Sequence, residues 1–522
     1  MTIVWSIAGT DSGGGAGLSA DQRAADAFGV HLCPVVAAVT AQHSRAVRHV
    51  EAMPVELLDA QLQALAEDMP PRVIKTGLLG GPAQLACVAR WVDRLRREQD
   101  VALVVDPVLG SSTGASFADA AMLQAYRDEL LPRATAVTPN LREARRLVAG
   151  AGVDDDAPAL ARALQQLGPS TVCITGGDEP SQDGRVRDWL ASPQASGWLA
   201  APRIATEHTH GTGCTFATSM TAALALGFPP ADAAVLAKMA TAGALRHGYE
   251  AGGGAGPVRA DAGFIVDPLL MPTLSWDETL DEAPPADQRT LAPPGLYAIV
   301  DSAERVERVL AASIRTLQLR IKTPSTPDAA WQARLQEQLR HSIQACRSAG
   351  ATLFINDHWA LAIELGADGV HLGQEDLAAL GPTGRTALRA SGLALGISSH
   401  SLWELARARS LAPRYIACGP VWPTLTKAMP WRAQGLDNLA WWCAMAGAPV
   451  VAIGGILSPA HVEQAAQCGA DGVCLVRVLG DDPVLTLPDL SDAWQRGRAL
   501  PVSPVGWPHP SLSAAEGRCP AG

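Results

Sequence analysis

The stretch "TLQLRIKT" (residues 316–323) combines the pattern of a buried strand with three strongly polar side chains. Apolar and polar residues alternate along it, and the polar ones are Gln318, Arg320 and Lys322. Successive side chains of a strand point to opposite faces, so the amide and the two cations share one face. Because apolar sequence flanks the stretch, the pattern predicts a buried strand whose polar face lines a binding site.

Seven more short apolar runs occur in the second half of the chain, and stretches with helical spacing separate most of them. Eight such units in about 200 residues predict a TIM (β/α)8 barrel, placed at residues 294–495. A doubly wound sheet is the alternative, although it accounts less well for eight similar units. The seven further runs are 296–300, 352–357, 369–373, 393–399, 415–420, 450–455 and 472–477.

Polar residues mark the C-terminal ends of most of these runs, which is where TIM barrels place their active sites. Arg320, Lys322 and Lys427 would form a cationic pocket. Asp357 and Asp376 would repel each other unless a cation lay between them, and Mg²⁺ bound by carboxylates and substrate phosphates meets that need. The pattern indicates a site for a magnesium-bound diphosphate.

Each of these signals has a plainer explanation when taken alone. Lys322 is typical of a solvated strand end, Asp376 of a helix cap, and Gly454–Gly455 of an ordinary turn. Their coincidence at several strand ends of one barrel favours a ligand site.

Several long motifs in this half resemble thiamine-phosphate synthase across nearly all of residues 294–480. They include "GLYAIVDS", "LFINDHWALAIELGADGVHLGQEDL", "GISSH", "GPVWPTLTKAMP" and "VAIGGI". The resemblance implies that diphosphate leaves a pyrimidine methylene and that a thiazole nitrogen captures the resulting cation, with no general base required.

The same resemblance implies roles for individual residues. The catalytic residues would be Arg320, Lys322 and Lys427, which would stabilise the charge on the departing diphosphate. Mg²⁺ would be held by Asp357 and Asp376. The pyrimidine diphosphate would be bound by Gln318, Leu319, Arg320, Ile321, Lys322, Asn356, Ser398 and Lys427. The thiazole phosphate would be bound by Thr424, Leu425, Thr426, Gly454, Gly455, Val476 and Arg477. Arg477 departs from the family, which usually has a small hydroxyl residue there.

The first half also alternates strand-like runs with helical spacing, which predicts a mostly parallel sheet covered on both faces. Its runs begin at residues 3, 34, 73, 101, 134 and 171. The glycine-rich segment 13–20 contains a loose dinucleotide fingerprint, but Gln42 stands where a Rossmann domain would offer an acid, so we reject that interpretation. "HTHGTGC" (residues 208–214) opens an apolar helix and is typical of an anion-binding turn. Cys214 there could equally be a buried small hydrophobe.

Six motifs of this half resemble the hydroxymethylpyrimidine/phosphomethylpyrimidine kinases of the ribokinase-like fold over residues 1–260. They are "IAGTDSGGGAGLSAD", "TAQHS", "KTGLL", "DPV", "TPNLREA" and "THGTGCTFA". The resemblance implies pyrimidine contacts by Asp21, Gln42 and Leu78, and a catalytic anion hole at Gly211, Gly213 and Cys214, with Cys214 in the position of the base. It places Asp106, Asn140, Glu143 and Thr175 around the ATP phosphates and Mg²⁺. Thr175 departs from the family, which commonly has a lysine there; Arg185, Arg187 or a second Mg²⁺ would have to compensate.

Composition and charge narrow the remaining possibilities. The chain has 522 residues, 48% of them hydrophobic and 18% charged, and a net charge of −11. These values suit buried α/β domains that bind small molecules and argue against nucleic acid. Ten scattered cysteines without a CxxC pair suggest reduced thiols. The N-terminal "MTIVWSIAGTDS" lacks the basic start of a secretory signal, and no apolar run reaches a membrane span, so we expect a cytoplasmic location.

Two Pro-rich stretches set the expected boundaries. Residues 261–293 are expected to form an acidic linker, which offers no support for direct channelling, and residues 496–522 a disordered tail. The prediction is a bifunctional thiamine-biosynthesis enzyme with an N-terminal ribokinase-like three-layer α/β/α domain and a C-terminal TIM barrel, using ATP and Mg²⁺. Two alternatives remain: a degenerate pyrimidine-binding first half, or a second half that modifies thiazole. The sequence leaves open whether the chain forms a homo-oligomer.

Overall fold

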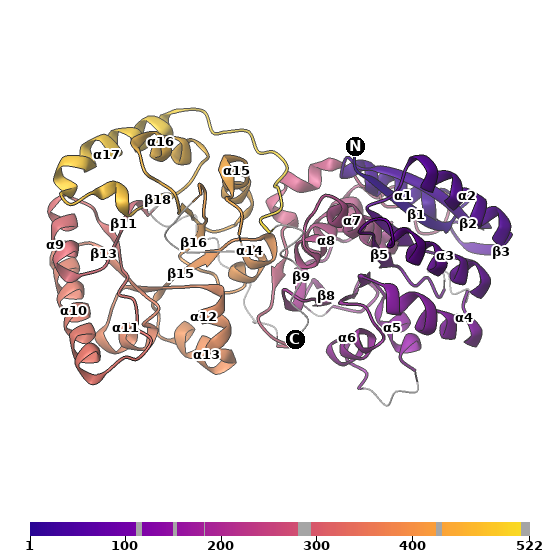
Figure 1. Ribbon diagram of the computed structural model, residues 1–522, viewed down its shortest axis with the longest axis horizontal. Helices are drawn as coiled ribbons and strands as arrows, with labels where there is room; N and C mark the ends of the chain where they lie inside the picture. The colour runs from indigo at the N-terminus through magenta and orange to yellow at the C-terminus, as the bar shows by residue number, and fades with distance from the viewer. Residues whose placement is uncertain (111–116, 150–153, 182, 280–293, 424–430, 513–522) are drawn as a thin grey trace. The chain divides into compact units, whose positions relative to one another are not determined.

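The protein forms two compact units that divide at residue 280 (Figure 1). A computed structural model describes residues 1–110, 117–149, 154–181, 183–279, 294–423 and 431–512. Each unit has its own apolar core, as the length of the chain requires.

The first unit is built on one ten-stranded sheet with the order β10-β9-β8-β7-β6-β5-β4-β1-β2-β3. Its middle strands run parallel, as predicted from the alternation of strands and helices. The strands are β1 (Ile3–Gly9), β2 (His31–His43), β3 (Ala46–Ala52), β4 (Val73–Thr76), β5 (Ala102–Val105), β6 (Ala136–Val137), β7 (Thr171–Ile174), β8 (Arg185–Ala191), β9 (Ser196–Pro202) and β10 (Thr273–Leu274).

The antiparallel strands at the two edges were not predicted. β3 pairs with the long β2, and β8 and β9 form a hairpin beside β7. Arginines and acids interrupt the apolar pattern of β3 and β8, so neither segment reads as a buried strand. β3 lies at one edge of the sheet, so its polar residues can face water, whereas the acid of β8, Asp188, is buried and paired with Lys238.

Helices complete the three layers of the first unit, confirming the ribokinase-like fold class. α7 and α8 are buried nearly all round, which explains why their sequences lack a polar face. The helices are α1 (Gly17–Ala27), α2 (Val55–Asp68), α3 (Pro82–Leu95), α4 (Ala120–Ala125), α5 (Leu141–Leu147), α6 (Ala157–Gln166), α7 (Thr212–Ala225) and α8 (Pro230–Arg246), with short turns η1 (Tyr126–Leu130), η2 (Leu131–Arg133), η3 (Ala262–Val266) and η4 (Pro268–Leu270).

The predicted linker begins too early. Residues 261–279 belong to the first unit, where Phe264, Ile265 and Leu270 are buried and β10 pairs with β9. These apolar side chains pack onto α8, which outweighs the Pro-rich, acidic composition of the segment as a whole.

The second unit is the predicted TIM barrel, a closed ring of eight parallel strands inside a ring of helices (Figure 1). The strands are β11 (Gly295–Val300), β12 (Thr316–Leu319), β13 (Thr352–Asn356), β14 (Gly369–Leu372), β15 (Ala394–Ser399), β16 (Tyr415–Cys418), β17 (Val450–Ala452) and β18 (Gly472–Leu475). The helices are α9 (Ala303–Ala311), α10 (Ala329–Ser348), α11 (Trp359–Leu365), α12 (Gln374–Ala379), α13 (Gly381–Ala390), α14 (Leu402–Arg409), α15 (Gly435–Met445), α16 (Pro459–Gln467) and α17 (Pro483–Ala499), with the turn η6 (Arg477–Leu479).

Three aromatic rings fill the interior of the barrel. Tyr297, Phe354 and Tyr415 pack against one another with ring centroids 5.1–5.9 Å apart. Two inward glycines make room for them, because a Cβ on Gly369 would lie 2.6 Å from Phe354 and one on Gly396 would lie 2.3 Å from Tyr415.

The predicted disordered tail is wrong for residues 496–512. Helix α17 continues to Ala499, and the following segment packs on the barrel through His509, whose backbone N–H donates to Asn438 Oδ1 at 2.8 Å. Leu512 is buried and pairs with Trp431. Hydrogen bonds and the buried Leu512 thus hold a segment whose Pro, Gly and Ser content suggests disorder.

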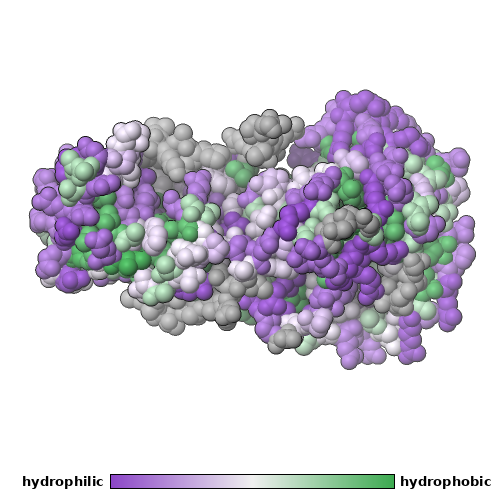
Figure 2. Space-filling view, turned by 90° about the horizontal axis from the view of Figure 1, so that it is seen from below, coloured by the Kyte–Doolittle hydropathy of each residue, from purple (hydrophilic) through white to green (hydrophobic). Residues whose placement is uncertain are grey.

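On the face seen in Figure 2, polar residues predominate and apolar residues occur in scattered patches. Within the described residues, none of the helices has the combination of length and apolar character needed to cross a bilayer.

Candidate active sites

A buried lysine lies at the centre of the polar cluster in the first unit. Lys75 Nζ, at the end of β4, lies 3.0 Å from both carboxylate oxygens of Asp21 and 3.7 Å from Oδ2 of Asp106. Burial lowers the pKa of Lys75, but the negative charge of Asp21, aided by Cys214 and Asp106, outweighs that effect and raises it. Lys75 is therefore a permanent cation inside the fold.

Asp21 is completely buried on α1, and both of its oxygens are engaged. Besides Lys75, they accept hydrogen bonds from Ser6 Oγ at 2.6 Å and from Thr218 Oγ1 at 2.8 Å. In this structure Asp21 holds Lys75, and its contact with the pyrimidine stays a prediction. The sequence signal for Lys75 was the "KTGLL" motif, whose lysine occupies an inward position of a buried strand.

Asp106 follows β5 and offers an unsatisfied oxygen. Its Oδ2 is buried and accepts no hydrogen bond from any described residue. Burial raises the pKa of Asp106 to about 6, with Lys75 lowering it and Asp21 raising it. A buried carboxylate oxygen without a donor is suited to a hard cation such as Mg²⁺.

Asn140 and Glu143 form a capping box at the start of α5. The Glu143 N–H donates to Asn140 Oδ1 at 2.9 Å, and the Asn140 N–H donates to Glu143 Oε2 at 3.0 Å. The other Glu143 oxygen accepts from Leu109 N–H at 3.2 Å, which ties α5 to the loop that carries Asp106. Burial and the charge of Asp106 raise the pKa of Glu143 to about 8. The capping box therefore holds the start of α5 against the loop that carries Asp106.

The glycine-rich turn after β1 contacts the turn that precedes α7. Asp11 accepts the N–H groups of Gly13, Gly15 and Ala16 at 2.8–3.0 Å, and it also bonds His210 Nε2 at 2.9 Å. Burial alone would raise the pKa of Asp11, but these hydrogen bonds lower it below the ordinary value. Asp11 and His210, neither of which was predicted as a site residue, thus fasten the first glycine turn to the second.

Gln42 and Leu78 lie beside these turns and are partly exposed. Gln42 Nε2 lies 3.3 Å from His210 Nε2. Leu78 lies over Gly9, where an added Cβ would come within 3.1 Å of its side chain. The structure therefore brings both predicted pyrimidine contacts to the edge of the glycine turns.

The "HTHGTGC" turn has the geometry of an anion site at the start of α7. Gly211 adopts a left-handed φ of 90° and caps the helix without a side-chain hydrogen bond, which leaves the first N–H groups of α7 without a side-chain cap. Burial raises the pKa of the nearby Cys214 thiol to about 12, opposed by Lys75, so the thiol is neutral in this state.

We expect Gly211→Ala to destabilise the first unit by about 1–3 kcal/mol, because the new Cβ meets both a left-handed backbone and a neighbouring carbonyl. That Cβ would lie 2.3 Å from the Gly15 oxygen. Urea unfolding followed by circular dichroism measures the loss. Gly213→Ala is the matched control, since its Cβ would enter open space; equal stability of the two variants would contradict the strained turn.

Thr175 lies opposite Asn140 at the end of β7. The two arginines expected to replace the missing family lysine are engaged elsewhere: Arg185 donates to Thr273 and Arg187 pairs with Asp183. A different cation lies nearby, because buried Lys238 pairs with Asp188 at 2.7 Å and Asp188 accepts the Gly176 N–H at 3.0 Å. The turn after β7 is thus anchored by a lysine from α8.

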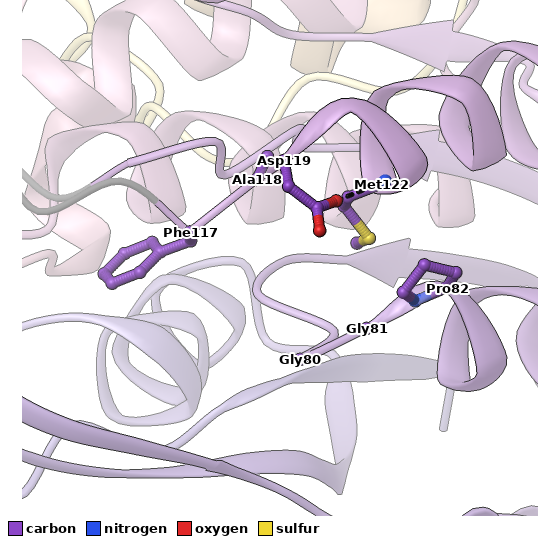
Figure 3. Close-up of a pocket in the computed structure, with 7 residues that line it drawn as sticks. All are labelled: Gly80, Gly81, Pro82, Phe117, Ala118, Asp119 and Met122. Carbon is purple, nitrogen blue, oxygen red and sulfur yellow. Dashed lines mark hydrogen bonds between the residues drawn. The ribbon is translucent and has the colours of Figure 1, made fainter.

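A cavity in the first unit lies away from these residues. It measures about 300 Å³ and lies between the turn at Gly80–Pro82 and the segment from Phe117 to Met122 (Figure 3). The Asp119 carboxylate there accepts the Met122 N–H and caps α4. None of the predicted site residues lines this cavity.

In the second unit, the polar residues of consecutive strands lie at one end of the barrel. Gln318 and Asn356 are 2% and 6% exposed, and they lie inside β12 and β13. β12 ends at Leu319, four residues earlier than predicted. Arg320 still extends the ladder through its N–H bond to Val300, whereas Lys322 is exposed in the following loop.

Asp357 and Asp376 follow the adjacent strands β13 and β14. Asp357 has a left-handed φ of 64°, and its N–H bonds the His371 carbonyl at 3.1 Å. Asp376 Oδ2 accepts a hydrogen bond from the Gly373 N–H at 2.9 Å, so Asp376 does cap the helix. Its side chain is exposed, and this bond uses only one of its two carboxylate oxygens. Carboxylate oxygens at the ends of two adjacent strands are of the chemical type that Mg²⁺ prefers, so these two residues stay the candidates to hold it.

The structure describes only some of the residues predicted to bind the thiazole phosphate. Gly454 and Gly455 have left-handed φ values, and a Cβ on either would lie 2.6 Å from Pro420 or Trp422, so only glycine fits. Val476 and Arg477 are exposed just after β18. Thr424, Leu425, Thr426 and Lys427 lie outside the described residues, so their roles stay predictions.

Sequence reasoning missed a set of hydrogen-bonded residues inside the barrel. Tyr297, Tyr415 and His371 are all at least 95% buried and link Gln318 to Ser398. Tyrosines within apolar strands read as core residues, and only the closed barrel brings their hydroxyl groups together.

Family comparisons match both halves of the chain. Residues 11–259 match phosphomethylpyrimidine kinase, and residues 296–479 match thiamine monophosphate synthase. A hydroxymethylpyrimidine/phosphomethylpyrimidine kinase of Synechococcus elongatus is 41% identical over 260 residues, which is 49% of this chain and 97% of that protein. A pyridoxal kinase from Staphylococcus aureus, solved with pyridoxal, is 29% identical, with a TM-score of 0.45 over 50% of this chain and 94% of that one.

Two relatives extend across both units, and both are named as chloroplastic. The probable thiamine biosynthetic bifunctional enzyme of Oryza sativa subsp. japonica is 33% identical over 92% of this chain and 86% of its own length. The thiamine biosynthetic bifunctional enzyme of Arabidopsis thaliana is 33% identical over 92% and 91%. The predicted cytoplasmic location is contradicted by these names. The start of the sequence was tested only for a secretory signal, which carries no information about plastids. With both of its units matched in the same order, the chain belongs to the family of bifunctional thiamine biosynthetic enzymes, with a phosphomethylpyrimidine kinase domain followed by a thiamine-phosphate synthase domain.

Proposed function

We propose that the first unit uses ATP to phosphorylate hydroxymethylpyrimidine and then its monophosphate, and that the second unit couples the diphosphate with thiazole phosphate. The observation that carries this proposal is the gathering of an amide, a guanidinium and two carboxylates from β12–β14 at one end of the barrel. A diphosphate clamp of this kind is of no use to an enzyme that modifies thiazole alone.

In the first unit, phosphoryl transfer requires mainly positioning and charge neutralisation. Lys75 pairs with Asp106 at 3.7 Å, and the N–H groups at the start of α7 would bind the transferred phosphoryl group. Because the transition state is loose, the attacking hydroxyl loses its proton late, so a neutral Cys214 thiol suffices as a hydrogen-bond partner. When bound, Mg²⁺ would neutralise phosphate charge, and Asp106 would hold it.

In the second unit, Arg320 would take the diphosphate through its planar fork of N–H donors. Asp357 and Asp376 would hold Mg²⁺, which when bound withdraws charge from the leaving group. Gln318, Asn356 and Ser398 would orient the pyrimidine ring so that the thiazole nitrogen can reach its methylene carbon.

We expect magnesium-dependent nucleotide binding to the first unit to weaken below pH 6 by up to about tenfold per pH unit, because protons compete for the metal-binding carboxylate. The pKa of Asp106 is raised to about 6, so its charged form is lost from that pH downward. Calorimetric titration with Mg-ADP at pH 5 and pH 7 measures the change. Asp106→Asn should bind weakly at both values; a wild type that binds equally at both would contradict the assignment.

Two assays on the purified chain test the two halves separately. Hydroxymethylpyrimidine with ATP and Mg²⁺ should give the monophosphate and then the diphosphate; the absence of turnover would favour a degenerate, ligand-binding first half. The diphosphate with thiazole phosphate should give thiamine phosphate; the absence of coupling would favour a thiazole-modifying second half.

A further inference from the structure

A continuous chain of hydrogen bonds crosses the interior of the barrel. Gln318 Nε2 donates to Tyr297 Oη at 3.2 Å, and Tyr297 Oη lies 2.6 Å from Tyr415 Oη. Tyr415 Oη lies 2.8 Å from His371 Nδ1, and His371 Nε2 lies 2.8 Å from Ser398 Oγ. Both tyrosines are fully buried, in a core where apolar rings would pack at lower cost.

The amide nitrogen at one end sets the direction of every bond in the chain. An amide N–H can only donate, so the Tyr297 oxygen accepts from Gln318 and its own proton goes to Tyr415. Tyr415 has then accepted one bond and donates its proton to His371 Nδ1. The direction of the hydrogen bonds is thus transmitted through residues of four strands, β12, β11, β16 and β14.

His371 passes the direction on because one of its ring nitrogens must accept a hydrogen bond. Its Nδ1 faces the Tyr415 hydroxyl, whose proton has no other acceptor within this chain of hydrogen bonds. With Nδ1 accepting from Tyr415, the single ring proton lies on Nε2 and is donated to Ser398 Oγ. The hydroxyl proton of Ser398 is then left for a ligand.

The two ends of the chain therefore present opposite hydrogen-bonding groups. Gln318 uses its nitrogen on Tyr297, which leaves its carbonyl oxygen as an acceptor; within the described residues that oxygen has no hydrogen bond. Ser398 presents a donor. A 4-aminopyrimidine offers the complementary pair, an amino donor beside a ring-nitrogen acceptor, whereas a 4-oxopyrimidine offers the reverse order.

We propose that Tyr297, Tyr415 and His371 are positioning residues that fix which hydrogen-bonding groups Gln318 and Ser398 present to a ligand. This proposal rests on the proposed function of the second unit. The synthase site thereby selects a 4-aminopyrimidine diphosphate and rejects its 4-oxo counterpart. A site built to pair specific polar groups discriminates strongly, because the wrong partner leaves buried groups unpaired.

The test compares kcat/KM for the amino and the oxo diphosphates in the full-length chain, each with thiazole phosphate. Wild type should prefer the amino compound by at least about 10³-fold. Tyr297→Phe frees the Gln318 amide to rotate, and Tyr415→Phe lets His371 take the other tautomer. Each should reduce the preference by about 10–100-fold, mostly by improving use of the oxo compound.

Phe354→Leu is the matched control, because Phe354 packs on both tyrosines but contributes no hydrogen bond to the chain. It should lower the melting temperature and leave the preference unchanged. The proposal is overturned if both tyrosine variants keep the wild-type preference, if Phe354→Leu reduces it equally, or if wild type prefers the oxo compound.

Failure of the proposed function would be seen separately. A wild-type chain that couples neither compound would reject the synthase assignment. Calorimetric binding of the two diphosphates to the same variants then tests the polarity: an amino preference that the two tyrosine variants reduce supports it, and equal binding of both compounds contradicts it.

Discussion

Lys75→Met is expected to reduce pyrimidine phosphorylation by at least about 100-fold, because it removes the cation that holds two carboxylates in the first unit. Lys75 is 1% exposed and pairs with Asp21 at 3.0 Å and with Asp106 at 3.7 Å. Without it, two buried acids repel each other, and Asp106 loses the neighbour that keeps it ionised. Initial rates of ADP release measure the effect.

The same substitution should lower the free energy of unfolding of the first unit by about 3–5 kcal/mol, because it leaves a buried charge uncompensated. The double variant Asp21→Asn/Lys75→Met separates stability from activity: it should recover most of the stability and none of the phosphorylation. Coupling by the second unit serves as the internal control and should be unchanged. A Lys75→Met chain with wild-type kcat/KM for phosphorylation would contradict the role of Lys75.

Arg320→Ala should reduce coupling of the pyrimidine diphosphate by about 10³-fold, because its guanidinium directly follows β12 and is the cation proposed to bind the diphosphate. Its N–H groups match the planar geometry of phosphate oxygens, which a lysine does not reproduce. Arg320→Lys should therefore recover only part of the activity. Quenched-flow formation of thiamine phosphate measures both variants.

Arg315→Ala provides the matched control at the other end of the same strand. Arg315 is exposed and donates to the carbonyls of Leu310 and Ile314, so its removal takes away a charge far from the predicted diphosphate. Coupling should be nearly unchanged in this variant. Equal losses in the Arg315 and Arg320 variants would indicate a general electrostatic effect and contradict a specific clamp.

The sequence was most informative where a local pattern was sufficient. All eight barrel strands were recognisable as short apolar runs, and the polar residues at their ends indicated the candidate site, because both features depend on a few neighbouring residues. The strand at 316–323 was drawn too long, since alternation continues through Lys322 although β12 ends at Leu319.

What the sequence could not reveal depends on contacts between distant segments. Lys75 meets Asp21 across 54 positions, and Tyr297 meets Tyr415 across 118. Asp21 occurs in a glycine-rich motif that suggests ligand binding, yet its helix turns it inward onto Lys75. The segments 261–279 and 496–512 have the composition of linkers, and only the buried apolar residues within them reveal that they pack.

The central claim is that one chain holds two separate, consecutive active sites. The most direct measurement mixes equal amounts of the Lys75→Met and Arg320→Ala chains with hydroxymethylpyrimidine, thiazole phosphate, ATP and Mg²⁺, and follows thiamine phosphate by chromatography. Neither variant alone should make the product at more than a trace, whereas the mixture should make it steadily, because the first site of one chain supplies the second site of the other. A mixture as inactive as the single variants, with both chains folded, would contradict the account.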